Sequence, residues 1–247
     1  MLSPVAATPI KADALKAACA HCNLRELCLP VGLSDKDLDS LDAMVAMRRS
    51  VRRGQLLFRT GDRFEAVYAV RSGFFKTQVA AQGGGDQVIG FQMAGELLGL
   101  DGIGTESHSC DAVALEDSQV CVIPFARLEE LSRECGDLQR QFHRLMSREI
   151  VRDHGVMLML GTMRAEARVA AFLLNLTRRL QARGFSPSAL VLRMTRAEIG
   201  TYLGLKLETV SRCFSKFQED GLLAVKQRQI RVLDQQALEE VVSRVAR

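Results

Sequence analysis

Three cysteines stand close together near the start of the 247-residue sequence, in the pattern Cys19-x-x-Cys22-x5-Cys28. Thiolates bind zinc, iron and iron–sulfur clusters, and this short spacing lets three thiols reach one centre. Three thiols do not complete a four-thiolate site. The spacing alone leaves both zinc and an iron–sulfur cluster open, and it leaves the fourth ligand open among Cys110, Cys121, Cys135 and, for zinc, His21.

The chain contains seven cysteines, an odd number that argues against a complete set of disulfides. It has no long apolar window, and the start of the sequence lacks the layout of a signal peptide. We therefore expect a soluble, cytoplasmic protein without membrane contact. No Walker loop, HExxH or GxSxG motif occurs, and the four histidines show no metal-ligand spacing, so an enzyme is not expected.

The charge is unevenly distributed along the chain. Residues 164–247 contain 15 Lys or Arg against 8 Asp or Glu, whereas residues 1–163 contain 18 against 21. The last third is therefore basic, which favours a polyanionic partner such as DNA, although a basic face is also common on ordinary solvated surfaces.

Residues 48–123 have the pattern of short strands separated by turns. Apolar runs at 66–70, 74–79 and 88–93 alternate with glycine-containing turns, which is typical of an all-β sandwich or barrel. After Pro124 the pattern becomes helical.

Residues 137–164 contain no proline and predict one long helix. Within it, intervals of four and three residues form the seam of a coiled coil, with a helix packed on its own domain as the alternative. The seam consists of Met146, Ile150, Asp153, Met157 and Leu160. Because Asp153 would bring two carboxylates together in a symmetric dimer, we assign Ile150 and Asp153 to a dimerisation switch.

A helix-turn-helix is predicted after Thr195, where Thr195 and Glu198 form a capping box and Gly204 ends the first helix. The second helix should bury Leu207, Val210, Phe214 and Phe217. Its outer face carries residues suited to base edges, namely Glu208, Ser211 and Arg212. A surface ion pair between Glu208 and Arg212 is the alternative. A hairpin near 221–232 adds a wing.

The sequence resembles the FNR branch of the catabolite-activator superfamily from Cys19 to the last hairpin. The motifs that carry this resemblance are the cysteine pattern and the stretches 68–73, 120–125, 178–179, 183–187 and 207–212, the last reading Leu-Glu-Thr-Val-Ser-Arg. The resemblance implies an α+β fold with an N-terminal β-roll, or double-stranded jelly-roll, sensor domain. A long dimerisation helix and a C-terminal winged helix-turn-helix follow.

The resemblance also implies an oxygen-responsive global transcription regulator that activates or represses genes as a homodimer. A [4Fe-4S] cluster would be held by Cys19, Cys22, Cys28 and Cys121, and oxygen would convert it and dissociate the dimer. Glu208, Ser211 and Arg212 would read a palindrome like TTGAT-N4-ATCAA. RNA polymerase would be a partner, and the charge-poor loop at 83–86 departs from the family's polymerase-contacting surface.

Four parts are expected: a cysteine-rich segment at 1–30, the β-roll at 31–136, the dimerisation helix at 137–164 and the DNA-binding domain at 165–247. A cyclic nucleotide is not expected, because Ser107-His108-Ser109-Cys110 offers no arginine to the phosphate. The remaining alternative is a helix-turn-helix regulator with structural zinc or a small-molecule effector.

Overall fold

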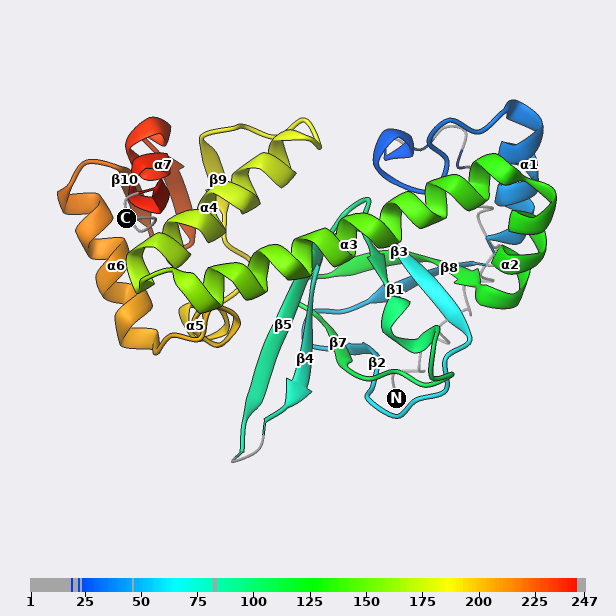
Figure 1. Cartoon of the computed structure of the whole chain (residues 1–247), viewed down its shortest axis with the longest axis horizontal. Coiled ribbons are helices and arrows are strands. Elements are labelled where there is room, and N and C mark those ends of the chain that lie inside the picture. The colour runs from blue at the N-terminus through cyan, green and yellow to red at the C-terminus, as the bar shows by residue number, and fades with distance from the viewer. Residues whose placement is uncertain (1–18, 20–21, 23, 46, 82–83, 244–247) are drawn as a thin grey trace, which may run out of the picture.

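A long helix, α3, runs across the molecule and joins its two halves (Figure 1). The computed structural model describes residues 19, 22, 24–45, 47–81 and 84–243. α3 spans Gly136–Thr162, close to the predicted 137–164. With 27 residues it is about 40 Å long. None of the described helices is long and apolar enough to cross a membrane.

The N-terminal half is a β-roll of two four-stranded antiparallel sheets, with orders β1-β8-β3-β6 and β2-β7-β4-β5. The strands are β1 (Met47–Val51), β2 (Leu56–Phe58), β3 (Ala66–Ser72), β4 (Phe74–Ala80), β5 (Asp86–Met93), β6 (Leu97–Leu98), β7 (Asp111–Ala114) and β8 (Ser118–Pro124). Both faces of the first sheet are covered. Val70 and Val120 point into the roll, while Val67, Ala69 and Ile123 point outward to a second core.

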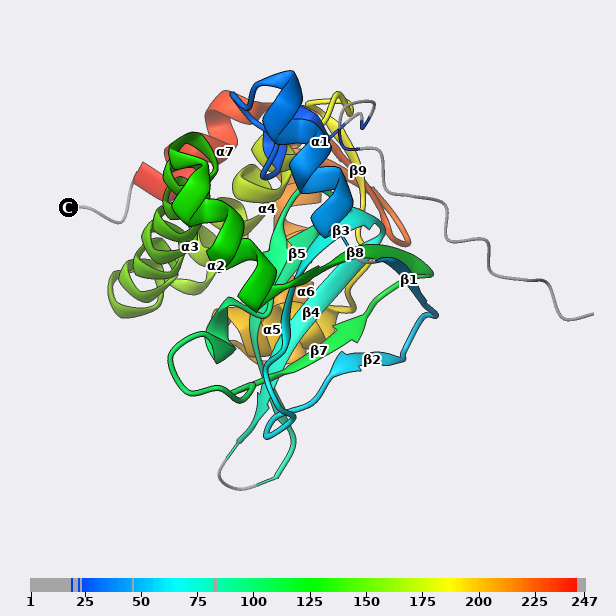
Figure 2. The ribbon, with the colours of Figure 1, turned by 90° about the vertical axis from the view of Figure 1, so that its right-hand side faces the viewer.

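Helices and the cysteine segment cover that outer face (Figure 2). They comprise the short 3-10 helix η1 (Arg25–Leu27), α1 (Asp35–Met44), α2 (Phe125–Glu134) and the first half of α3. Ser34 caps α1 by accepting from the backbone N–H of Asp37 at 3.3 Å. Because strand residues alternate between faces, β3 and β8 contribute to two cores at once.

The C-terminal half contains the predicted helix-turn-helix and wing. Its elements are α4 (Ala165–Gln181), β9 (Ala189–Val191), α5 (Arg196–Leu203), α6 (Leu207–Glu219), β10 (Leu223–Lys226), β11 (Gln229–Val232) and α7 (Gln235–Ser243). The capping box of Thr195 and Glu198 is present at α5. Gly204, at φ +63°, ends α5, and at Gly200 a Cβ would lie 2.6 Å from the Leu205 carbonyl oxygen. The tight turn therefore requires both glycines.

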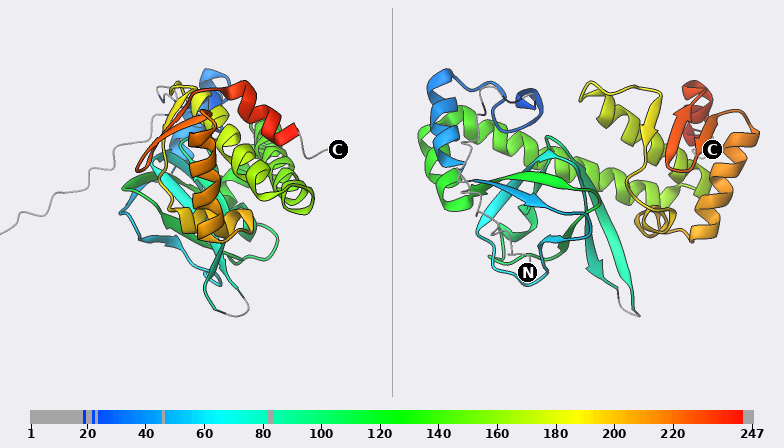
Figure 3. Two further views of the ribbon diagram at one scale, coloured as in Figure 1. Left: turned by 90° about the vertical axis from the view of Figure 1, so that its left-hand side faces the viewer. Right: turned by 180° about the vertical axis from the view of Figure 1, so that it is seen from behind.

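The two halves share one hydrophobic core, in which strands β4 and β5 pack against α4 and α5 (Figure 3). Phe91 of β5 lies 5.1 Å from the ring of Tyr202 on α5. Lys76 of β4 forms an ion pair with Glu198 at 2.9 Å, and Gln87 of β5 donates to the Thr201 carbonyl. The β4–β5 hairpin thus supports the first helix of the helix-turn-helix.

Candidate functional site

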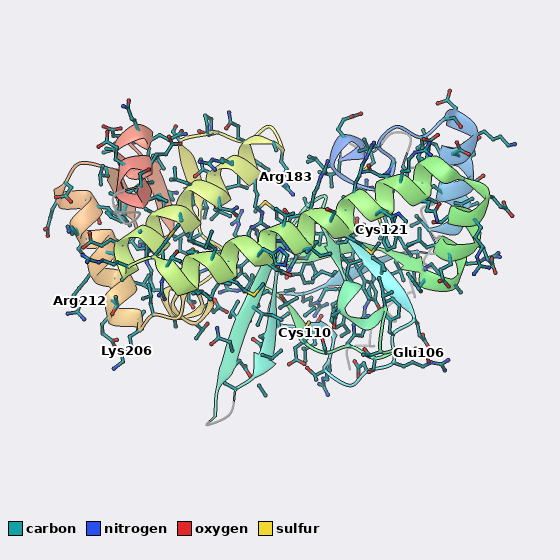
Figure 4. All side chains as sticks on the ribbon, in the orientation of Figure 1. Glu106, Cys110, Cys121, Arg183, Lys206 and Arg212 are labelled. Carbon is teal, nitrogen blue, oxygen red and sulfur yellow. The ribbon has the colours of Figure 1, made fainter. Side chains whose placement is uncertain are left out.

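Four cysteines from two distant parts of the chain line one apolar pocket. Cys19, Cys22 and Cys28 come from the N-terminal segment, and Cys121 comes from strand β8. Each is half-buried and free of disulfides. Apolar side chains surround them, among them Leu24, Leu29, Pro30, Leu41, Val45 and Ile123. Cys121 lies below α3 on the roll, away from the recognition helix (Figure 4).

The cysteine segment is fixed to the rest of the molecule by a few polar contacts. Gln141 of α3, which is buried, donates to the carbonyl of Cys28 at 3.1 Å. The backbone N–H of Cys19 donates to the Asp42 carboxylate of α1. The segment is therefore tied to α3 at Cys28 and to α1 at Cys19.

The four thiols influence one another. Burial is the main reason that the pKa of Cys28 rises to about 12, and Cys121 and Cys22 add to the rise. Burial and then Asp42 raise the pKa of Cys19. Burial also raises the pKa of Cys121, although Arg71 opposes that rise. The raised pKa values of Cys19, Cys28 and Cys121 favour their protonated forms, and a metal centre would have to displace those protons to bind.

The chemistry of the donor set decides which centres the pocket could hold. Within the described ranges, no group of three or more His, Cys, Asp or Glu side chains is arranged to hold a metal ion. Zinc and a [4Fe-4S] cluster can both take four thiolates, and the cluster takes one on each iron atom. Four thiols around an apolar pocket are a donor set that fits such a cluster.

The other candidate ligands lie elsewhere. Cys110 is buried in the roll, with its sulfur 3.6 Å from the Asp101 carboxylate. Cys135 caps α3, where its sulfur accepts from the backbone N–H of Leu138 at 3.4 Å. Neither lines the pocket, and His21 lies outside the described residues.

The second candidate site is the outer face of α6, at the opposite end of the molecule (Figure 4). Glu208, Ser211 and Arg212 are all exposed there, and no ion pair joins Glu208 to Arg212 in this described helix. The inner face buries Val210, Phe214 and Phe217 as predicted. The prediction was wrong for Leu207, which is the first residue of α6 and is 45% exposed. Cys213 is buried on the inner face instead.

Comparisons with known proteins agree with both halves of this architecture. Residues 48–135 match the cyclic nucleotide-binding domain, and residues 167–241 match the Crp-like helix-turn-helix domain. The transcriptional activator protein anr of Pseudomonas aeruginosa is 48% identical over 92% of this chain and 94% of that protein. The fumarate and nitrate reduction regulatory protein of Escherichia coli K12 is 44% identical over 90% and 89%.

The chain belongs to the CRP/FNR family of transcription regulators. It is also 47% identical to the transcriptional regulatory protein btr of Bordetella pertussis, over 95% of this chain and 96% of that protein. Among solved structures it is similar to FixK2 from Bradyrhizobium japonicum, with a TM-score of 0.74 and 31% identity over 80% of this chain and 97% of that one. The α+β fold and the DNA-binding helix-turn-helix are therefore confirmed, and the protein is a regulator and not an enzyme.

This CRP/FNR regulator contains an ionic cluster that sequence patterns did not assign. Glu96, between β5 and β6, binds Arg179 at 2.5 Å, Arg183 at 2.7 Å and Arg152 at 3.4 Å. Arg152 belongs to α3, Arg179 belongs to α4, and Arg183 lies two residues after the end of α4. One carboxylate therefore joins the roll, the long helix and the DNA-binding half.

A second connection of the regulator is made by Arg168 of α4. Its guanidinium donates to the carbonyls of Met163 and Leu160 at 2.8 Å and of Leu203 at 3.0 Å. It thereby fixes the end of α3 to the turn of the helix-turn-helix. No short sequence motif marks Arg168, because its acceptors are backbone carbonyls from two separate segments, the ends of α3 and α5.

Proposed function

We propose that this regulator responds to oxygen through a [4Fe-4S] cluster bound by Cys19, Cys22, Cys28 and Cys121. The observation that carries the proposal is the convergence of these four thiols on one apolar pocket. The sequence resemblance to the FNR branch supports the same four ligands. When bound, the cluster supplies an oxygen-reactive centre.

The chain's own residues would couple that centre to the long helix. Leu29 and Leu41 exclude water from the pocket, and Gln141 holds the Cys28 carbonyl against α3. Residues 1–30 would hold the cluster, and 31–136 would form the sensor roll. Residues 137–164 would dimerise, and 165–247 would bind DNA.

The dimer interface would lie on the exposed side of α3. Four large apolar side chains are exposed there, at 55 to 65%: Ile150, Val151, Met157 and Leu158. Asp153 is exposed between them, whereas Met146 and Leu160 at the ends of the predicted seam partly pack against the chain's own cores. In this proposal, Ile150 and Asp153 would control dimerisation. Burying an apolar stripe of this size against a second copy would stabilise the dimer.

Two recognition helices must stand about 34 Å apart to enter successive major grooves, so specific binding needs a dimer. Glu208, Ser211 and Arg212 would read each half of a palindrome like TTGAT-N4-ATCAA. An arginine fork suits guanine, a carboxylate suits cytosine, and a hydroxyl suits either. RNA polymerase would then be contacted to activate transcription, while other promoters would be repressed.

The family's nucleotide pocket would not bind a cyclic nucleotide in this protein. His108 is stacked on Phe58, with ring centroids 3.7 Å apart, and is turned edge-on to Phe64. The Asp101 carboxylate accepts from the Ser109 backbone N–H at 2.7 Å. A carboxylate at this position would repel a phosphate.

Anaerobic purification of the full chain tests the proposal. We expect a brown protein with iron and sulfide in equal amounts, dimeric in sedimentation and bound to the palindrome in gel shifts. Air should bleach the colour and release the DNA. A colourless protein that contains zinc would instead support the structural-zinc alternative.

A further inference from the structure

Two arginines flank Cys121 on the sheet face that forms the cysteine pocket. Strand β8 lies between β1 and β3, and Cys121 is paired with Arg48 of β1 on one side and Ala69 of β3 on the other. Directly paired residues share a face of the sheet, and so do residues two apart on a strand. Arg48 therefore lies beside Cys121, and Arg71 follows Ala69 on the same face.

Arg71 is aimed at the cysteines by a local irregularity. The pairing of β3 with β8 shifts register between Val70 and Ser72, so Arg71 sits at a bulge, a feature that redirects a side chain. Its side chain lines the pocket together with all four cysteines.

Arg48 lies on the other side of Cys121 and is only half-buried, but its Nε is buried and has no hydrogen-bond partner. In the described part of the chain, neither Arg48 nor Arg71 forms an ion pair with a carboxylate. The Arg71 side chain thus lines the pocket and Arg48 is paired with Cys121 beside it, and neither positive charge is neutralised by an ion pair there.

The pocket needs positive charge once a cluster is bound. The core of a [4Fe-4S] cluster carries fewer positive charges than its four thiolates carry negative ones, and Asp42 beside Cys19 adds another negative charge. Net negative charge in an apolar pocket is costly unless cations or hydrogen-bond donors compensate it.

We propose that Arg48 and Arg71 are positioning residues that compensate the charge of the cluster site, with Arg71 donating to the sulfur of Cys121. This inference rests on the proposed cluster. Hydrogen bonds to cluster sulfurs and nearby charge set the reduction potential, and outer partners of metal ligands control metal retention. Both quantities should therefore depend on these two side chains.

The test uses the full-length protein with Arg48→Gln, Arg71→Gln and Arg71→Lys. Arg49→Gln is the matched control, because Arg49 is the next residue on β1, is exposed, and lies on the opposite face near Tyr68. We measure anaerobic loss of iron to a chelator and the midpoint potential of the cluster. Each Gln variant should lose iron about 10-fold faster and have a more negative potential, because an added electron is less well stabilised. Arg71→Lys, which keeps the charge, should stay closer to the wild-type potential, and Arg49→Gln should match the wild type.

The possible outcomes separate this inference from the proposed function. Wild-type potentials and iron retention in both Gln variants would overturn the role of the arginines and leave the cluster assignment standing. A wild-type protein without a cluster would overturn both. Thermal melting of the metal-free proteins gives a further check: Gln variants that melt well below the wild type would show that the arginines serve the fold, and this too would overturn the inference.

Discussion

Arg179 donates to both carboxylate oxygens of Glu96, with distances of 3.0 Å from Nε to Oε1 and 2.5 Å from Nη2 to Oε2. This two-pronged contact joins the end of α4 to the turn between β5 and β6. Arg183 donates to the same carboxylate and also to the carbonyl of Ala94. The orientation of the DNA-binding half relative to the roll therefore depends strongly on one carboxylate, whose side chain is 12% exposed.

Replacing Glu96 by Gln should destabilise the protein by about 3–5 kcal/mol, because it removes the counter-charge of arginine side chains that are only 6 to 18% exposed. The free energy of unfolding in urea measures this loss. Glu130→Gln is the control, since Glu130 pairs with Arg127 on an exposed surface and should change stability little. Equal effects of the two substitutions would contradict a special role for Glu96.

The same acid should contribute to the pH dependence of stability. Burial would raise the pKa of Glu96, but Arg179, Arg152 and Arg183 more than offset it and hold the pKa below its ordinary value of 4.5. The stabilisation is therefore complete above pH 4.5 and is lost as the pH falls through the lower folded pKa. The stability gap between wild type and Glu96→Gln should shrink over that acidic range, as urea titrations at several pH values would show.

Replacing any one of the four pocket cysteines by Ala should remove the cluster and the anaerobic DNA binding, because a four-thiolate site loses a ligand. The controls are the three buried thiols outside the pocket, Cys110, Cys135 and Cys213. Iron and sulfide analysis of the seven variants measures occupancy. Full occupancy in Cys121→Ala would show that the fourth ligand is a different residue.

Arg212→Ala should weaken binding to the palindrome by about 1–3 kcal/mol through loss of a bidentate base contact. Binding to random duplex should change little, so that specificity falls more than affinity. Quantitative gel shifts on both duplexes test this. Equal weakening on the two would mean that Arg212 contacts only phosphate.

Asp153→Ala should produce a dimer that binds the palindrome in air or without a cluster. Two Asp153 carboxylates brought together in the interface should cost on the order of 1–3 kcal/mol, enough to leave the cluster-free dimer marginal. A cluster that stabilises the dimer only moderately more than the monomer could then shift this monomer–dimer equilibrium.

Sedimentation and gel shifts on aerobic protein measure the effect of Asp153→Ala. Asp137→Ala is the control, because Asp137 is at the start of α3, away from the apolar stripe, and is engaged with Arg140. A monomeric, inactive Asp153→Ala protein would show that this carboxylate does not restrain dimerisation.

Local signals predicted the helix-turn-helix well. The capping box at Thr195 and the glycine turn at Gly204 act within a few residues, so they can be read from the sequence without the fold. The burial of Leu207 was wrongly predicted, because helical spacing does not show that the first residue of α6 lies outside the hydrophobic core. The helices α1 and α7 were not predicted.

Only some of the long-range features could be predicted from the sequence. The spacing predicts Cys19, Cys22 and Cys28 as ligands of one centre. Only the family resemblance indicated Cys121 as the fourth, because it is the folded sheet that brings β8 under the cysteine segment. No local pattern singles out Glu96, since its three arginine partners lie on elements far along the chain. No sequence pattern singles out Arg48, because its place beside Cys121 follows from the register of β1 and β8.

The carboxylate of Glu198 has two tasks: it closes the capping box of α5 and it binds Lys76 of the roll. The first helix of the DNA-reading unit is therefore seated partly by a strand of the other half. Chimeras that exchange DNA specificity between such regulators cannot be cut cleanly after the long helix. A transplanted reading unit needs a compatible β4–β5 hairpin in its host. If the unit carries an acid at the position of Glu198, the host needs a lysine at the position of Lys76.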